Sequence, residues 1–176
     1  MSFLDSLDDP LQRQMYDYWQ RKRVGRRMPR RRDIDPVDIP RLLPNILISE
    51  VVPSSGRARY RYRLAGTAIV RAFGRDPTGH FADDLTNGAY RDFIMGLHRT
   101  VSEERRALFC ESRYLAQREY HMVAKRLLLP VSEDDDRVNQ IISLLVFRFG
   151  SKQPATIALD QTEGTTRHAE PVLAEV

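Results

Sequence analysis

Three apolar segments follow one another late in the chain with only short breaks between them. They cover residues 107–115, 121–131 and 138–149, and the second break contains the charged run 133–136. A parallel crossover needs a dozen or more residues, so segments this closely spaced must pair as antiparallel strands. The last segment is apolar on both faces, which indicates that other elements cover both sides of the sheet that it joins.

Two more strands are expected earlier in the chain, at residues 45–52 and 58–65, with a turn of Pro, Ser and Gly between them. In the second of these strands, arginines at positions 59, 61 and 63 alternate with apolar residues, which is typical of a half-buried strand. A short helical segment at 66–74 and a longer helix at 90–104 separate these two strands from the final three.

An N-terminal helix begins at Asp9-Pro10, because Asp is a preferred N-cap and Pro suits the first helical position. It is expected to end near Gly25, with basic residues in its last turn. Its apolar residues recur with the period of one helix face. They are Leu11, Met15, Tyr18 and Trp19. We expect this stripe to cover the second face of the sheet and to offer an interface to a partner protein.

The sequence therefore predicts an α+β fold, in which a five-stranded antiparallel sheet has helices on one face and the N-terminal helix on the other. Residues 1–25 are expected to form an N-terminal unit that consists of this amphipathic helix and the residues before it. The main domain spans 26–149 and begins with a proline-rich connector at 26–44, in which Asp35-Pro36 opens a single capped helical turn. Residues 150–176 lack periodicity and are expected to form a disordered tail.

Composition and motifs exclude several classes of function. The single Cys110 cannot form an internal disulfide, and no cluster of Cys and His has the spacing of a zinc site. No apolar run reaches the 18 residues of a membrane span and no signal pattern opens the chain, so a cytoplasmic protein is expected. The short motifs of serine hydrolases, zinc proteases and P-loop NTPases are missing, and we expect no enzymatic activity.

The order of the elements and several motifs resemble a PAS domain. The motifs are Trp19, Met28-Pro29, Asp33-Ile34-Asp35-Pro36, Tyr60 to Thr67, Gly74-x-Asp76-x-Thr78-Gly79 and Leu127 to Ser132. Over residues 10–149 the chain looks like a stand-alone, PAS-like bacterial family that was long known only as a domain of unknown function and is common in alphaproteobacteria. The resemblance implies a PAS fold used for sensing or for protein–protein regulation, without established catalytic residues.

The resemblance also places a candidate ligand pocket between the inner face of the sheet and the longer helix, because PAS domains can enclose a small cavity there. The residues expected around it are Tyr60, Tyr62, Phe73, Phe93, Leu97, His98 and Phe147. The alternative is that these side chains only fill the core. His98 lies on the helix from which haem-binding PAS domains ligate the iron. Haem is therefore one candidate cofactor, although no specific motif identifies any ligand.

Basic residues are concentrated in one segment. Eight of the twelve residues from Arg21 to Arg32 are Arg or Lys, whereas the rest of this chain of net charge +4 is mildly acidic. The segment is either a solvated helix end, a contact for an acidic protein, nucleic acid or anionic lipid, or a receptor for cyclic-di-GMP. Cyclic-di-GMP would use the residues Arg26, Arg27, Arg30 and Arg31, whose spacing suits phosphate groups, but the second motif of such receptors is missing.

Taken together, these features predict a non-enzymatic sensor or adaptor in bacterial signalling that acts by protein–protein contact. The expected partners are a second copy of the chain, which would form a homodimer, and a histidine kinase. A small-molecule or cyclic-dinucleotide receptor is the alternative, and a haem-binding sensor is a further one. Nucleic acid is not expected as a partner, and the acidic run 133–136 is expected to be a solvated turn because it lacks the spacing of a calcium loop.

Overall fold

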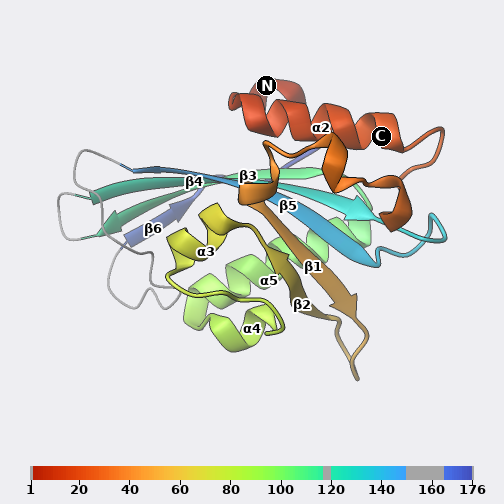
Figure 1. The fold of residues 1–176 in the computed structure, drawn as a ribbon. Helices are drawn as coiled ribbons and strands as arrows, with labels where there is room; N and C mark the ends of the chain where they lie inside the picture. The colour runs from red at the N-terminus through yellow and green to blue at the C-terminus, as the bar shows by residue number, and fades with distance from the viewer. Residues whose placement is uncertain (1, 117–119, 150–164, 176) are drawn as a thin grey trace.

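The structure, a computed structural model, describes residues 2–116, 120–149 and 165–175. The five predicted strands form one antiparallel sheet in the order β2–β1–β5–β4–β3 (Figure 1). Their bounds are β1 Ile46–Val52, β2 Arg59–Ala65, β3 Leu108–Ala116, β4 Tyr120–Val131 and β5 Gln140–Phe149. The strand that is apolar on both faces, β5, lies between β1 and β4 in the middle of the sheet.

Two short strands near the C-terminus extend this sheet beyond the predicted five. β6 Thr165–His168 and β7 Val172–Leu173 both pair antiparallel with β3. The expectation of a disordered segment is therefore wrong for residues 165–173, while residues 150–164 lie outside the described part of the chain. The physical reason is that the backbone N–H and C=O groups of β3 need hydrogen-bond partners, and a segment without hydrophobic periodicity can supply them.

Helices cover both faces of the sheet (Figure 1). On the face that we call the inner face lie α3 Thr67–Phe73, α4 Ala82–Leu85 and α5 Gly88–Glu104. On the opposite, outer face lies α2 Pro10–Lys22, as predicted for the N-terminal helix. Among the described residues, no helix is long and apolar enough to cross a membrane.

The outer helix α2 begins where its capping sequence predicts. The Asp9 carboxylate accepts a hydrogen bond from the backbone N–H of Leu11 at 2.9 Å, and Pro10 occupies the first helical position. The helix packs on β4 and β5. There the buried indole N–H of Trp19 donates a hydrogen bond to the carbonyl oxygen of Pro130 at 2.9 Å, which fixes the helix to the sheet.

A further short helix, α1 Phe3–Ser6, precedes α2 and was not foreseen from the sequence. Its Phe3 is buried and packs on Tyr16 of α2, with 5.0 Å between the ring centroids. The same helix contacts β7, so the two ends of the chain lie close together at one side of the molecule (Figure 1).

The connector from α2 to β1 follows an ordered path rather than a free one. It contains three 3-10 turns, η1 Arg31–Asp33, η2 Pro36–Asp38 and η3 Leu43–Asn45. As predicted, Asp35 caps the second turn, since its carboxylate accepts the backbone N–H of Val37 at 2.9 Å. In Figure 1 the connector (orange) lies between α2 and the start of β1.

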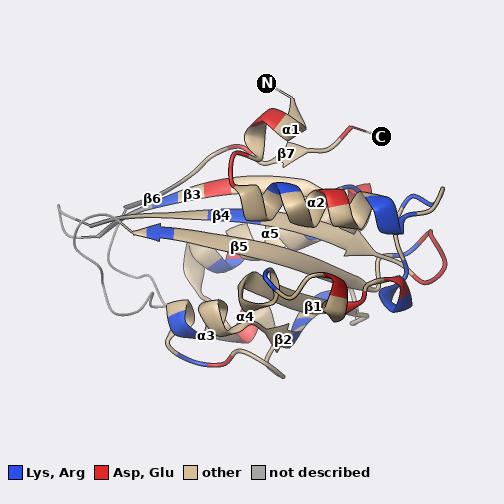
Figure 2. Ribbon diagram, turned by 45° about the horizontal axis from the view of Figure 1, so that its top comes forward, with Lys and Arg blue, Asp and Glu red and all other residues tan. Residues whose placement is uncertain are grey.

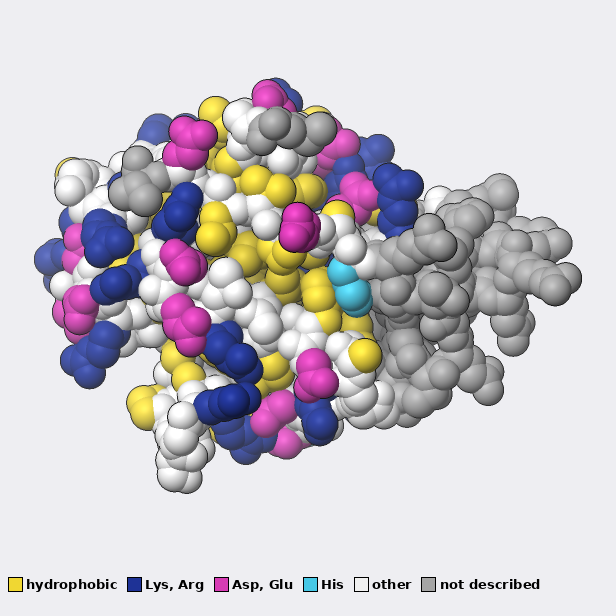
Figure 3. All heavy atoms as spheres, turned by 180° about the vertical axis from the view of Figure 1, so that it is seen from behind, with side chains coloured by type: hydrophobic (Ala, Val, Ile, Leu, Met, Phe, Trp, Pro, Cys, Tyr) yellow, Lys and Arg dark blue, Asp and Glu magenta, His cyan; other side chains and the backbone are white. Residues whose placement is uncertain are grey.

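The side of the molecule that faces away from the viewer of Figure 1 carries apolar as well as charged side chains at its surface. Figure 3 shows apolar side chains in a band across this side, with charged side chains around it. α5 and β7 carry half-buried apolar residues that pack against the core. They include Tyr90, Phe93, Met95, Val172 and Leu173. Some of the apolar side chains that pack on the core therefore remain partly exposed on α5 and β7.

Candidate functional site

The space between the inner face and α5, where the sequence analysis places a ligand pocket, is almost filled by side chains. Tyr60, Tyr62, Leu97 and His98 are buried there. The cavity that remains has a volume of about 30 Å³. Such a volume holds about one water molecule, whereas small-molecule sites usually measure about 300–1,000 Å³. The geometry therefore favours the interpretation of these residues as core.

The structure does not bring all seven expected pocket residues to this cavity. Tyr62, Phe73, Leu97 and His98 line it, while Tyr60, Phe93 and Phe147 do not. Phe73 and Phe147 pack edge-on against each other at 6.3 Å between ring centroids. Phe93 instead stacks against His168 of β6 at 3.4 Å.

His98 has both ring nitrogens engaged by neighbouring groups. Nδ1 lies 2.9 Å from the carbonyl oxygen of Ile94, which can only accept, so Nδ1 carries the proton. Nε2 then accepts a hydrogen bond from the hydroxyl of Ser49 at 3.1 Å. Burial lowers the pKa of His98 from 6.5 to about 4, so the ring is neutral near pH 7. With Nε2 engaged and so little space beside it, these residues do not fit a haem group.

A buried arginine closes the other end of this space. Arg126 of β4 donates from Nη1 to the hydroxyl of Ser112 at 2.8 Å, and its guanidinium lies 5.8 Å from the centroid of the Phe93 ring. Ser112 also hydrogen-bonds Nδ1 of His168 at 2.9 Å. Burial, with the Arg126 charge beside it, lowers the pKa of His168 to about 4. This network was not predicted from the sequence, although the arginine inside the apolar strand 121–131 was a signal for it.

The apolar stripe of α2 is not available to a partner protein. Met15, Tyr18 and Trp19 are buried within the chain, and Leu11 is half-buried against the same core. The expectation that this stripe forms an interface is therefore wrong, because covering the outer face of the sheet already uses it.

The basic segment contacts the acidic turn between β4 and β5 (Figure 2). Arg26 donates from Nε to the carbonyl of Met28 at 3.1 Å and from Nη2 to the carbonyl of Ser132 at 3.1 Å. Its Nη2 also lies 4.0 Å from the carboxylate of Asp135. The guanidinium of Arg26 is therefore committed to the chain's own backbone, which corrects its assignment as an anion contact.

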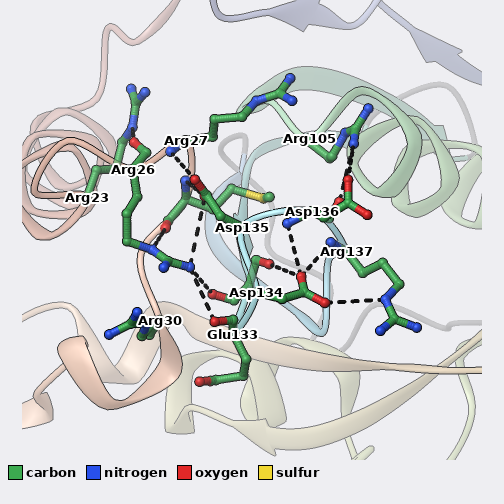
Figure 4. Close-up of polar contacts among 12 residues, drawn as sticks. Arg23, Arg26, Arg27, Arg30, Arg105, Glu133, Asp134, Asp135, Asp136 and Arg137 are labelled. Carbon is green, nitrogen blue, oxygen red and sulfur yellow. Dashed lines mark hydrogen bonds and ion pairs between the residues drawn. The ribbon is translucent and has the colours of Figure 1, made fainter.

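The acidic turn in return binds the backbone of the basic segment (Figure 4). Asp135 accepts the N–H groups of Arg27 and Met28 at 3.1 and 3.0 Å, and Glu133 accepts the N–H of Arg31 at 3.1 Å. Burial opposes ionisation of Asp135, but these N–H groups and the Arg26 charge outweigh it, and the pKa ends below its usual value. The run 133–136 is thus a docking point for the connector, not merely a solvated turn.

The other arginines of the segment have different surroundings. The Arg31 guanidinium donates from Nη1 to the carbonyl of Ile34 at 3.0 Å and is half-buried, as is Arg30. Arg27 is exposed, and in Figure 4 its side chain extends away from the acidic turn. The structure therefore does not gather Arg26, Arg27, Arg30 and Arg31 into one anion site.

Comparison with known protein families agrees with this architecture. A family model described as the PAS domain matches residues 7–146, which run from before α2 into β5. The chain belongs to the PAS domain family. No curated protein and no solved structure matches the sequence. PAS domains are sensory and signalling domains, so the fold supports a role in signalling without naming a ligand or a partner.

A second cavity lies on the outer face of this PAS domain, where the sequence did not predict one. The cavity lies between the connector and strands β1, β2 and β5, and its volume is about 410 Å³. Its lining consists almost wholly of aliphatic residues and prolines, with Arg31 at one side. α2 packs on β4 and β5, so the connector rather than α2 covers this part of the outer face.

Proposed function

We propose that this PAS domain is a non-enzymatic, cytoplasmic signalling adaptor that binds another protein where α2 meets the connector. The observation that carries the proposal is a pair of exposed apolar side chains in that region. Val24 is 84% exposed and Val37 is 82% exposed. A single exposed apolar residue needs no explanation, but several in one region are typical of protein contact sites.

These two valines flank an ion pair that joins α2 to the connector. Nζ of Lys22 lies 2.9 Å from the carboxylate of Asp38. Val24 follows Lys22 by two residues and Val37 directly precedes Asp38, so both belong to the same edge of the molecule. Val24 also has a φ of 47°, a left-handed conformation that is unfavourable for a β-branched residue. Strain of this kind is common at functional positions.

The charge near this edge supports an acidic partner. Arg21, Arg27 and Arg32 are exposed on the same basic segment, beyond the arginines that contact the acidic turn. A basic surface attracts a protein of opposite charge and repels a second copy of itself. We therefore place a different protein, such as a histidine kinase, before a homodimer as the partner. The space between the inner face and α5 is almost filled by side chains, which favours a protein contact at the surface over a ligand in that space.

The test is affinity capture from cells with the double variant Val24→Asp/Val37→Asp and with Leu4→Asp as the matched control. Leu4 is 56% exposed on α1, so the control makes the same kind of substitution away from the proposed surface. We expect the wild-type chain and Leu4→Asp to capture the same protein, and the double variant to lose it. Equal capture by all three would refute the proposed surface.

Light scattering on the purified chain separates the two kinds of partner. A second copy as partner predicts the mass of two chains for the wild type and of one chain for Val24→Asp/Val37→Asp. The mass of one chain in both cases leaves a different protein as the partner.

A further inference from the structure

We propose that the outer-face cavity binds a small amphiphile, an apolar chain with a carboxylate head, of the class of medium-chain fatty acids. This goes beyond the proposed adaptor function and does not depend on it, because the cavity and its test involve no partner protein. The proposed site lies on the opposite side of the sheet from the space between the inner face and α5.

The floor of the cavity is the outer face of three strands. Ile46 and Ile48 of β1 and Ile142 of β5 lie on it, and Leu64 of β2 forms the rim at 45% exposure. Register agrees with this placement, since Ile48 pairs with Leu64 on one side and with Ile142 on the other. The floor is therefore a continuous aliphatic surface that hydrocarbon can cover.

The roof is the connector, and its shape is fixed by proline. Pro36, Pro40 and Pro44 all line the cavity, and each fixes its own φ angle and lacks an N–H group that could pair with the sheet. Three 3-10 turns shape the same stretch. β1 already pairs with β2 and β5, so the connector has no free edge of this strand to join, and it passes over the floor.

Both ends of the roof are anchored, so it cannot simply collapse onto the floor. At one end the hydroxyl of Tyr18 accepts the backbone N–H of Asp35 at 2.8 Å. At the other end the side-chain amide of Asn45 donates to the carbonyl of Leu145 at 2.8 Å. Gly66 fits so closely below Leu43 that a Cβ atom there would lie 2.1 Å from the Leu43 carbonyl oxygen.

The size and lining of the cavity argue for an apolar occupant. The cavity is a groove that is partly open to solvent, and apolar grooves of this kind are typical of binding sites. The cavity here measures about 410 Å³, within the range of small-molecule sites. Water gains few hydrogen bonds in such a space, whereas a hydrocarbon chain recovers the contacts that the lining otherwise lacks.

One charged group determines the head group of the ligand. Among the described residues that line the cavity, Arg31 is the one with an ionisable side chain. One of its Nη1 hydrogens is donated to Ile34, and a guanidinium has five N–H donors in a planar arrangement that suits a carboxylate. A carboxylate head at Arg31 with the chain directed between Leu64 and the prolines satisfies both the charge and the apolar lining.

The test is isothermal titration of the purified chain with decanoate, kept below its micellar concentration, and with decanol as the uncharged probe. We expect decanoate to bind at one site with a negative heat-capacity change, and decanol to bind more weakly. Leu64→Trp places an indole across the rim and should weaken both probes at least tenfold. Leu4→Trp, which adds the same indole on α1, should change neither.

The head group is tested by Arg31→Ala against Arg32→Ala, its exposed neighbour. We expect Arg31→Ala to weaken decanoate about tenfold and leave decanol within about twofold, and Arg32→Ala to change neither. Retained decanol binding in Arg31→Ala shows that the cavity is still formed. The proposal fails if decanoate gives no heat at millimolar concentration, if Leu64→Trp binds it like the wild type, or if both arginine variants behave alike.

Discussion

His98 makes the stability of this PAS domain depend on pH in a direction that can be calculated. Its pKa is about 4 in the folded chain against 6.5 ordinarily, mainly because burial disfavours the charged ring. Protonating the folded state here is therefore harder by roughly 3 kcal/mol. Below about pH 6.5 the unfolded chain binds this proton and the folded chain does not, so the free energy of unfolding falls until about pH 4.

The measurable quantity is the difference between wild type and His98→Gln. Between pH 7.5 and pH 5, His98 should remove about 2 kcal/mol from the free energy of unfolding of the wild type, and this part is missing in the variant. Urea denaturation followed by the fluorescence of Trp19, the single and buried tryptophan, reports the unfolding. The absolute stability of His98→Gln is also expected to fall, because Ile94 and Ser49 lose their partner.

Acidic groups also titrate in this range, so the comparison needs a control that removes a histidine elsewhere. His80 is exposed, and His80→Gln should follow the wild-type curve. If the free energies of unfolding of wild type and His98→Gln fall in parallel from pH 7.5 to pH 5, the inference that His98 is buried in its neutral form is refuted.

Two further substitutions test the anchoring of the connector. Asp135→Asn weakens two charge-assisted hydrogen bonds to backbone N–H groups and should lower the free energy of unfolding by about 1–2 kcal/mol in urea denaturation. The control Asp136→Asn, at a carboxylate that is 75% exposed, should lower it by less than about 0.5 kcal/mol. Equal losses in the two variants would contradict the docking role of Asp135. Gly66→Ala forces a Cβ atom to within 2.1 Å of a backbone carbonyl oxygen and should lower the free energy of unfolding by several kcal/mol, or prevent folding altogether, as measured by circular dichroism. Gly96→Ala, where a Cβ atom meets nothing, should be neutral or stabilising by up to about 1 kcal/mol. Similar stability of the two variants would contradict the tight packing at Gly66.

Local patterns were sufficient to predict α2, α3, α5 and the five main strands, whereas the short helices α1 and α4 were not predicted. The stripe from Leu11 to Trp19 has the period of one helix face, and the alternation at 59–64 has the period of a strand, so each pattern is contained in a few neighbouring residues. The match over residues 7–146 confirms the family resemblance, while the order of the strands in the sheet was not among the predictions. Such local patterns do not tell which distant residues each face of a helix or strand contacts. The hydrogen bond from Trp19 to Pro130 joins residues 111 positions apart, and no local signal announces it.

The same limit explains the errors at the candidate sites. Counting arginines between Arg21 and Arg32 gives the charge of the segment, but the contact between Arg26 and the acidic turn depends on a fold that brings residues more than 100 positions apart together. The cavity on the outer face depends on the height at which prolines hold the connector above β1, which composition does not encode. β6 has four residues, most of them polar, and β7 has only two, so no periodicity can reveal either strand.

The C-terminal strands also change what counts as a minimal form of this domain. The family match ends at residue 146, within β5, and a fragment cut directly after β5 at residue 149 would lack both β6 and β7. It would leave β3 as a bare outermost strand, and a long strand with unpaired backbone groups recruits strands from other molecules. Precipitation of such a fragment would therefore report an unprotected edge and say nothing against the core. The chain protects this edge with a segment that begins after the family match ends.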